Sequence, residues 1–521
     1  MSVHYAVDFG TTNTVVASDR EGAVSVLAFP EWMAERIRTP VVPSAVCFRA
    51  QSATPYLGQQ AVLQNAFGRL PGYAQGFKRY LGRERYRVVA RWGERDISAR
   101  RAGEVFFDGL RSGIHQLHAP RRPGRGWWDL LWGQRSPLIG NLTLSSPVDA
   151  DEYYRGELSA LGRRLGARTL HLVDEPVAAA LGYGVNVGRD LTLLVVDWGG
   201  GTLDVSVVRT GPETLSDGRA QVLAKGAAPV GGDDVDHWIV ERFVSPLERF
   251  VHDGEVDAYW EAARVKELAG ILGAAAFRFR DRAEAPFTRD DLIAILEERG
   301  AYRALEEALR STLDALQRQH GLGPVAIDEV LLVGGSCLLP GVESRVRQMA
   351  PQARLGEWNP FAAVAMGACE FGRGGHIVDQ VYHDYALRMA DDACRSVYYE
   401  LIFPAGSPYP SEPATREYLP DPGSPDLMVF EICEIARLGR TPVEWREEAP
   451  GRRVWRPTDP ADHARAVVIN EGNTSLRLFA ARARNTPIQV SYRLDRDRRL
   501  RWTVLDGEAL LKDDLVLGRL R

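Results

Sequence analysis

The spacing of hydrophobic positions divides the chain into three regions. From residue 1 to about 190, apolar runs typical of buried strands alternate with segments whose apolar residues recur every three to four positions, as in helices. The same texture repeats from about 191 to 375. Beyond about 380 it changes to short alternating runs separated by turns rich in Pro and Gly. The pattern predicts two α/β lobes followed by a small all-β sandwich.

Particular elements follow from the same spacing. The clearest helical stripe covers residues 104–117, and a long helical stretch is predicted for 288–320, opening at a capping sequence that begins with Thr288. Helical composition also marks 152–165, 177–183, 234–250 and 255–272. A buried strand at 330–333 ends in a glycine pair. In the last region, strands are predicted for 397–403, 427–435, 466–469, 476–483, 488–494 and 500–505.

Two segments of the chain repeat each other. Residues 7–16 and 196–205 both read as a strand ending in Asp, a turn of Gly and Thr, and a second strand. Glycine turns let backbone N–H groups approach an anion, and a carboxylate at a strand end can hold hydrated Mg²⁺. Either hairpin alone is equally well an ordinary turn. Two matched copies one lobe apart, with Asp8 and Asp197 at the same offset, predict a phosphate and its magnesium clamped between the lobes.

Other segments have ordinary structural explanations when taken singly. The glycine pairs at 231–232 and 334–335 would suit a plain turn as well as a flat ligand lying on the backbone. Glu175 precedes Pro176 and an alanine-rich helix, where an acidic residue complements the helix dipole. Lys78 alone would be read as a solvated surface lysine.

Together these segments resemble the ATPase unit of the heat-shock protein 70 (DnaK-type) chaperone family, in the actin-like, ribonuclease-H-like ATPase superfamily. The segments that carry the resemblance are VDFGTTNTVVA (7–17), GFKRYLGR (76–83), DEPVAAALGYG (174–184), VDWGGGTLDVSVV (196–208), PVGGDDVD (229–236) and LLVGGSCLLPGV (331–342). They cover nearly all of residues 1–373. The resemblance implies ATPase lobes at 1–190 and 191–375, a linker at 376–384, and a β-sandwich at 385–521 that is weakly similar to the family's peptide-binding domain and lacks its helical lid.

The resemblance also implies roles around the phosphates of ATP or ADP. Asp8 and Asp197 would hold the Mg²⁺ shell, and K⁺ as a further cation is left open. Lys78 would face the γ-phosphate, with Glu175, Asp204 and Thr202 completing the catalytic network. The implied phosphate contacts are Gly10, Thr11, Thr12, Asn13, Gly199, Gly200, Gly201 and Thr202.

The nucleoside side and the link between domains are less regular. The resemblance implies that Gly334, Gly335 and Ser336 lie behind the adenosine and that Gly231 and Gly232 also bind the nucleotide. Candidates on the helix that contacts the base are Glu261, Arg264 and Lys266. Pro147 and Arg155 match the family's interdomain switch, but Val148 and Asp149 replace the aromatic residues that follow this proline. Leu338 replaces an arginine that stacks on the base, and Phe361 replaces a carboxylate near the ribose. These departures predict altered nucleotide affinity or selectivity.

Composition narrows the class of protein. The 521 residues carry a net charge of −5, which argues against a general nucleic-acid binder. The five cysteines are scattered, so buried reduced thiols are expected and a disulfide framework is not. Neither a secretory signal nor a run of about 20 apolar residues is present, so a soluble cytoplasmic protein without a transmembrane segment is expected. The loop at 121–132, with three Trp and three Arg, either contacts a partner or packs against its lobe.

The sequence therefore predicts a slow, ATP-driven, chaperone-like switch. Its partners would be a peptide or protein client and, as the resemblance implies, a J-domain or nucleotide-exchange co-chaperone. Three alternatives stay open at this point: a nucleotide-dependent actin-like scaffold, a sugar-kinase-like phosphotransferase, and a nucleotide sensor that does not hydrolyse ATP.

Overall fold

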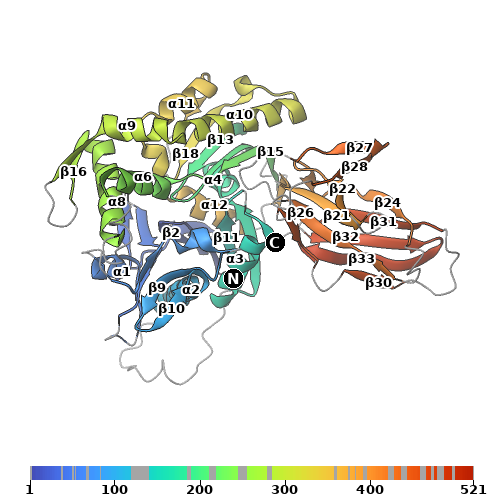
Figure 1. The fold of residues 1–521 in the computed structure, drawn as a ribbon, viewed down its shortest axis with the longest axis horizontal. Helices are drawn as coiled ribbons and strands as arrows, with labels where there is room; N and C mark the ends of the chain where they lie inside the picture. The colour runs from blue at the N-terminus through green and yellow to red at the C-terminus, as the bar shows by residue number, and fades with distance from the viewer. Residues whose placement is uncertain are drawn as a thin grey trace. The chain divides into compact units, whose positions relative to one another are not determined.

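Two compact units make up the chain (Figure 1). The first contains Met1–Val148 and Gly156–His376, and the second contains Asp149–Arg155 and Ile377–Arg521. The computed structural model describes residues 3–20, 22–36, 39–49, 52, 54–65, 70–82, 84–118, 140–148, 150–184, 189–210, 219–244, 255–278, 284–356, 359, 361–372, 376–381, 383–390, 396–420, 427–435, 443–457, 465–470, 474–477, 486–495 and 499–519.

A first mixed sheet lies in the N-terminal half of the first unit. Its strands follow the order β12-β11-β1-β2-β5-β4, with β3 also on β2: β1 His4–Phe9, β2 Asn13–Arg20, β3 Ala23–Val26, β4 Ala34–Arg36, β5 Thr39–Pro43, β11 Asn141–Ser146 and β12 Thr169–Asp174. Smaller sheets join β6 Ala45–Cys47, β7 Tyr56–Leu57 and β8 Tyr73–Gln75, and β9 Val88–Trp92 and β10 Arg95–Ser98. The helical segments are α1 Gly58–Gln64, η1 Phe77–Tyr80, α2 Ala99–His118, α3 Glu152–Arg164 and α4 Glu175–Gly184.

A second mixed sheet repeats this arrangement. The order β19-β18-β13-β14-β15 uses β13 Leu191–Trp198, β14 Leu203–Thr210, β15 Arg219–Ala228, β18 Glu329–Val333 and β19 Arg354–Leu355. A hairpin of β16 Ala274–Phe277 and β17 Ala285–Thr288 stands apart. The helical segments are α6 Gly232–Phe243, α8 Glu255–Leu272, α9 Arg289–Glu298, α10 Ala301–His320, η3 Pro324–Ala326, η4 Gly335–Leu338, α11 Val342–Met349 and α12 Ala363–Gly372.

The two sheets place their central strands equivalently. β1 pairs with β11 in parallel and with β2 antiparallel, and β13 pairs in the same two ways with β18 and β14. Every residue of β13 is buried, as a strand covered on both faces requires. The repeated sequence pattern therefore corresponds to a repeated topology, and the α/β character is confirmed.

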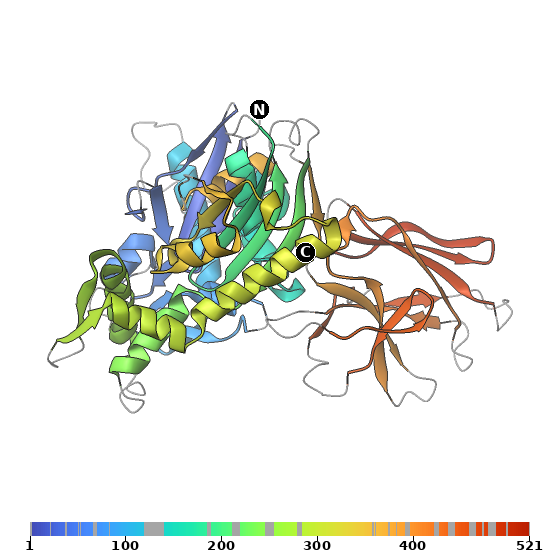
Figure 2. The same cartoon turned by 90° about the horizontal axis from the view of Figure 1, so that it is seen from above.

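Two short helices fill the space between these sheets, as the turned view in Figure 2 lets the reader follow. Helix α4 packs on β13 and β14, while α12 packs on β1, β2 and β11, and the two helices pack on each other. Small residues make the close approach possible. A Cβ on Gly367 would lie 1.6 Å from the carbonyl oxygen of Ala178, and one on Gly182 would lie 2.8 Å from that of Ala363.

The long helical stretch predicted for 288–320 is wrong in one respect. It is broken into α9 and α10 at Gly300, which takes φ of 76°, a backbone conformation that favours glycine. The strand predicted for 427–435 is likewise interrupted at Phe430. The predicted helix 234–250 ends as α6 at Phe243, and residues 245–250 lie outside the described part of the chain.

The described residues of 377–521 form strands and connecting segments. One sheet has the order β27-β28-β22-β21-β26-β29, a second has β24-β31-β32-β33, and β25 pairs with β30 and β20 with β23. Their bounds are β20 His376–Gln380, β21 Asp384–Ala390, β22 Val397–Phe403, β23 Pro408–Tyr409, β24 Ala414–Tyr418, β25 Leu427–Val429, β26 Glu431–Ile435, β27 Arg446–Ala449, β28 Arg452–Trp455, β29 Ala466–Val468, β30 Ser475–Arg477, β31 Ile488–Leu494, β32 Arg499–Asp506 and β33 Ala509–Arg519.

One core joins both larger sheets of this unit. Tyr385 and Ile432 from the first sheet share an apolar cluster with Tyr492 and Trp502 from the second. Part of the segment predicted as the linker, residues 376–380, is strand β20. The domain boundaries themselves stay a prediction.

Two composition-based expectations can be compared with the described residues. Cys47, Cys337, Cys369 and Cys433 are buried free thiols, and Cys394 lies outside the described part. Within the described ranges, no helix is both long enough and apolar enough to cross a bilayer.

Candidate nucleotide site

Four charged side chains from distant parts of the sequence converge at the ends of the two central strands. Asp8 is the penultimate residue of β1 and Asp197 the penultimate residue of β13. Glu175 begins α4, and Lys78 lies in η1. Lys78 Nζ donates to Glu175 Oε1 at 2.8 Å, and these side chains are only 6% and 9% exposed. Lys78 is therefore a buried member of the cluster, and the surface-lysine interpretation is wrong.

Negative charge is in excess in this cluster. Burial, and then the charge of Glu175, raise the pKa of Asp8 to about 6, although Lys78 and a hydrogen bond from Ser145 Oγ at 2.7 Å oppose the shift. Burial is also the main cause that raises the pKa of Asp197 well above its ordinary value, followed by the charges of Glu175 and Asp8. A cation placed between the carboxylates would relieve this repulsion.

The donor set fits a hydrated magnesium ion. Mg²⁺ keeps several waters and typically takes one or two protein carboxylates together with phosphate oxygens. Asp8 and Asp197 are two such carboxylates. Among the described residues, no group of three or more His, Cys, Asp and Glu side chains is arranged to ligate a metal directly, which is the pattern of a different, all-protein site.

The two glycine hairpins face each other beside these carboxylates. A Cβ added to Gly200 would lie 2.4 Å from Thr12 Oγ1, and one added to Gly201 would lie 2.8 Å from Thr11 Oγ1. Thr12 Oγ1 also donates to Asp233 Oδ1 at 3.4 Å. The backbone of the second turn thus lies in contact with the threonine side chains of the first turn.

The glycine pairs near the second hairpin serve close packing around it. Gly232 N donates to Gly199 O at 3.0 Å, and Ser336 Oγ donates to the same oxygen at 2.7 Å. Gly334, with φ of 82°, approaches Trp198 so closely that a Cβ would lie 2.4 Å from its carbonyl oxygen. The structure therefore brings two separate segments of predicted nucleotide contacts, 231–232 and 334–336, to the second hairpin.

The two basic candidates on α8 differ in their surroundings. Lys266 Nζ lies 2.8 Å from both Gly232 O and Asp236 Oδ1, next to the hairpin. Arg264 forms a fork with Glu261 at 2.6 and 2.7 Å and also donates to Ala276 O. A role for Arg264 toward a base stays a prediction, because Glu261 already engages its guanidinium.

Asp204 connects the site to the segment that leads toward the second unit. It pairs with Asp197 in the β13–β14 register, and its Oδ1 accepts from the backbone N–H of Val148 at 2.9 Å. Pro147 lies immediately before Val148, and residues 149–155, which include Arg155, group with the C-terminal unit. Both predicted switch residues, Pro147 and Arg155, therefore lie where the chain passes between the first and the second unit.

Comparison with known proteins bears on this geometry. The chain is 29% identical to the chaperone protein DnaK of Thermus thermophilus over 393 residues, which is 71% of this chain and 60% of that protein. It is 30% identical to the chaperone protein dnaK3 of Synechocystis over 389 residues, which is 70% of this chain and 47% of that protein. It is 28% identical to the chaperone protein HscA of Cronobacter sakazakii over 387 residues, which is 70% of this chain and 56% of that protein. The resemblance to the heat-shock protein 70 family is confirmed.

A family model described as MreB/Mbl protein matches residues 134–247. This stretch contains the second hairpin, Glu175 and Asp204. The aligned part spans about half to three fifths of the length of the DnaK, dnaK3 and HscA relatives. What those whole proteins do is therefore carried to this chain only as a proposal.

The departures from the heat-shock protein 70 pattern lie on the nucleoside side. Leu338 is 61% exposed, and the ring of Phe361 lies 4.0 Å from where a Cβ of Gly335 would be. An aliphatic and an aromatic surface thus stand where the family has an arginine and a carboxylate. The Trp-rich loop at 121–132 lies outside the described residues.

Sequence reasoning missed several residues of the site. Ser145, which donates a hydrogen bond to Asp8, lies in β11 but carries no motif of its own. Arg79 Nη2 lies 2.7 Å from Asp234 Oδ1 and its Nη1 3.9 Å from Asp233 Oδ2, which joins η1 to α6 across the hairpins. The adjacent acidic pair in PVGGDDVD was the available signal for this contact.

Proposed function

We propose that this protein binds Mg·ATP between its two sheets and hydrolyses it slowly, with the nucleotide state controlling peptide or partner binding by the C-terminal β unit. The observation that carries the proposal is the convergence of Asp8, Asp197, Glu175 and Lys78 beside two facing glycine hairpins. Similarity to DnaK and HscA chaperones supports the nucleotide-binding, chaperone-like part.

The residues present define what each would do. Magnesium, when bound, would neutralise phosphate charge beside Asp8 and Asp197. The backbone N–H groups and hydroxyls of the two hairpins would hold phosphate oxygens. Lys78 would place its ammonium against the charge that develops on the transferring phosphoryl group. Glu175 fixes the orientation of Lys78 by accepting a hydrogen bond from its ammonium at 2.8 Å, and would orient the attacking water with its second oxygen.

Val148 supports a route from this site to the C-terminal unit. Its N–H is bonded to Asp204, and the residues that follow it group with the C-terminal unit. A shift of Asp204 between nucleotide states would therefore pull on backbone directly continuous with residues 149–155. A ligand changes such an equilibrium only through its different affinity for the two states.

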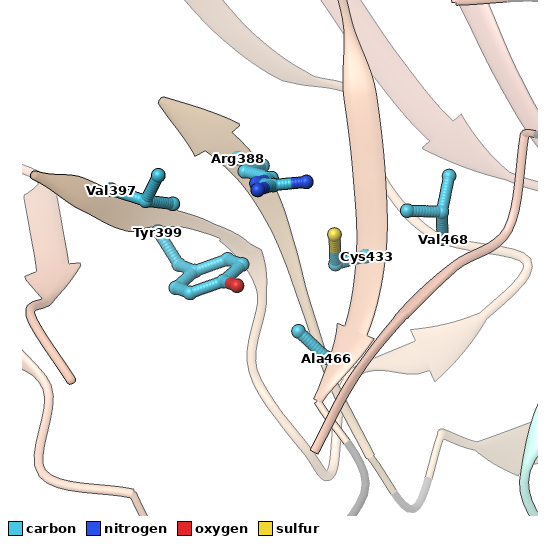
Figure 3. A pocket seen from close by; sticks show the side chains of 6 residues that line it. All are labelled: Arg388, Val397, Tyr399, Cys433, Ala466 and Val468. Carbon is cyan, nitrogen blue, oxygen red and sulfur yellow. The ribbon is translucent and has the colours of Figure 1, made fainter. Parts of the chain in front are cut away.

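A pocket in the C-terminal unit supports a peptide site (Figure 3). It encloses about 340 Å³ and is lined by Arg388, Val397, Tyr399, Cys433, Ala466 and Val468. Cys433 lies between Ile432 and Glu434 on β26, so the pocket opens on the face opposite the core shared by the two sheets. In the proposed sandwich, this pocket would accept an apolar side chain of an extended peptide.

The test is steady-state ATP turnover by the full chain, with and without a library of extended peptides. We expect slow turnover that apolar peptides stimulate severalfold, and a loss of about 10²–10³ in kcat for Lys78→Ala. Lys512→Ala, on strand β33 of the C-terminal unit, is the control. Turnover by Lys78→Ala equal to that of the native protein would reject the catalytic assignment.

A second candidate is an actin-like scaffold or sensor that does not bind peptides. The match of residues 134–247 to the MreB/Mbl family model favours it. Nucleotide-dependent sedimentation of the pure protein, together with turnover that no peptide alters, would support this candidate over the chaperone. The client, the J-domain or exchange-factor co-chaperone, and a requirement for K⁺ remain parts of the proposal that the same assays would address.

A further inference from the structure

A buried ion pair joins the two sheets one residue from Glu175. Lys225 Nζ lies 2.5 Å from Asp174 Oδ2, and the two side chains are 3% and 1% exposed. Asp174 is the last residue of β12 in the first sheet, whereas Lys225 lies on β15 of the second sheet. The pair therefore connects the strand end that leads directly into α4 with the opposite side of the interface.

The strand register places Lys225 on the face that α4 covers. Lys225 is opposite Ser206 on β14, and Asp204 lies two residues before Ser206, on the same face of that strand. The other face of β14 carries Leu203, Val205 and Val207 of the apolar core. The ion pair and the Asp204–Val148 bond are thus neighbouring links across one interface.

Stability alone does not account for such a pair. Removing two charges from water costs about as much as their attraction returns, so an apolar pair of similar size would often stabilise the fold equally well. The position is more informative. Asp174 directly precedes Glu175, which accepts a hydrogen bond from Lys78 Nζ, so the ion pair lies at the start of the helix that carries this contact.

We propose that Lys225 is a positioning residue for Glu175. By holding Asp174, it fixes the end of β12 and the first turn of α4, and so sets where the Glu175 carboxylate meets Lys78 Nζ. Lys225 itself acts through Asp174 and has no assigned contact with the nucleotide. The activity part of this inference rests on the proposed ATPase function.

The test compares Lys225→Met with the double variant Asp174→Asn/Lys225→Met. The single variant removes the ammonium that faces the buried carboxylate of Asp174 and is expected to lower the melting temperature strongly. The double variant removes both charges and is expected to melt within a few degrees of the native protein. The double variant therefore stays folded for measurement but lacks the ion pair that we propose positions Glu175.

Two readouts separate positioning from a merely structural role. In the double variant we expect the amides of residues 178–181, the first ones bonded within helix α4, to exchange hydrogen at least tenfold faster than in the native protein. We also expect kcat for ATP to fall at least tenfold while the Kd for ATP changes less than threefold. Tyr183→Phe is the matched control, because it removes a bond of 2.5 Å from the same helix to Glu329 of β18, two turns away from Glu175.

The outcomes are distinct. Native exchange and native kcat in the double variant would overturn the proposal, as would an equal effect of Tyr183→Phe on both readouts. If the native protein itself fails to hydrolyse ATP, the proposed function fails, and the exchange of the amides of residues 178–181 still decides whether Lys225 positions the start of α4.

Discussion

At the residue scale, the site is defined by charges that would repel each other in the absence of a ligand. Three carboxylates lie around one buried ammonium; burial first, and then the neighbouring carboxylates, raise the pKa of Asp8 and that of Asp197. Such an arrangement stores binding energy for a cation and fits an enzyme that positions a charged substrate. It also means that neutralising one of the aspartates should not harm the fold.

His4 shows the opposite case of a buried base. Burial, and then the charge of His171, lower its pKa from 6.5 to about 4, and its Nε2 lies 3.0 Å from Thr143 Oγ1. Between these values the unfolded chain binds a proton that the folded chain does not, so stability falls as pH drops from about 6.5 toward 4. We expect His4→Gln to remove up to about 2 kcal/mol of this pH dependence. Urea unfolding at pH 7.5 and at pH 5 gives the free energy of unfolding of both proteins. If this free energy changed equally with pH in the native protein and in His4→Gln, the assignment would be contradicted.

At the scale of elements, the contact between α4 and α12 determines how closely the two sheets approach. Its small residues explain why DEPVAAALGYG is rich in alanine, which the sequence alone could attribute only to helix packing in general. Helix α4 also carries Glu175 at its first position. Packing and the position of the candidate catalytic group are therefore coupled through one helix.

Gly367→Ala tests this contact. The new Cβ would overlap the carbonyl oxygen of Ala178, so we expect a loss of about 1–3 kcal/mol in the free energy of unfolding. Gly270→Ala is the matched control, because it lies in helix α8 and its Cβ would have no neighbour within 4 Å. There we expect no loss, or a gain of about 0.5–1 kcal/mol from helix propensity. Denaturant unfolding should show a loss of stability for Gly367→Ala that Gly270→Ala does not share, and equal losses would contradict the packing account.

Arg79 joins η1 to α6 through Asp234 and Asp233 and would close over bound phosphates. All three side chains are about a quarter to a third exposed, so the ion pairs of Arg79 should add only about 1 kcal/mol or less to the free energy of the closed arrangement. We expect Arg79→Ala to speed release of a fluorescent ADP analogue severalfold at low salt, and less at high salt. Arg91→Ala, which breaks an exposed pair within one hairpin, should leave the rate unchanged. A salt-independent rate in the native protein would argue against this closure.

At the scale of the whole molecule, local patterns predicted more than distant contacts. Each hairpin could be predicted from a dozen neighbouring residues, and the repeat predicted matching topology in the two sheets. The burial of Lys78 could not be predicted in this way, because its partner Glu175 is 97 positions away. The Asp174–Lys225 pair was equally invisible, since only the packed fold brings β12 and β15 together. The break at Gly300 was missed because apolar periodicity continues on both sides of it.

The central claim is that Asp8 and Asp197, from matched strands, hold one magnesium nucleotide between the two sheets. Calorimetric titration of ATP into the native protein, Asp8→Asn and Asp197→Asn, each with Mg²⁺ and with excess EDTA, tests it most directly. We predict that each variant binds Mg·ATP at least tenfold more weakly than the native protein, whereas ATP without Mg²⁺ binds no more weakly, because a repelling charge is removed. Magnesium-dependent binding that survives unchanged in either variant would contradict the account.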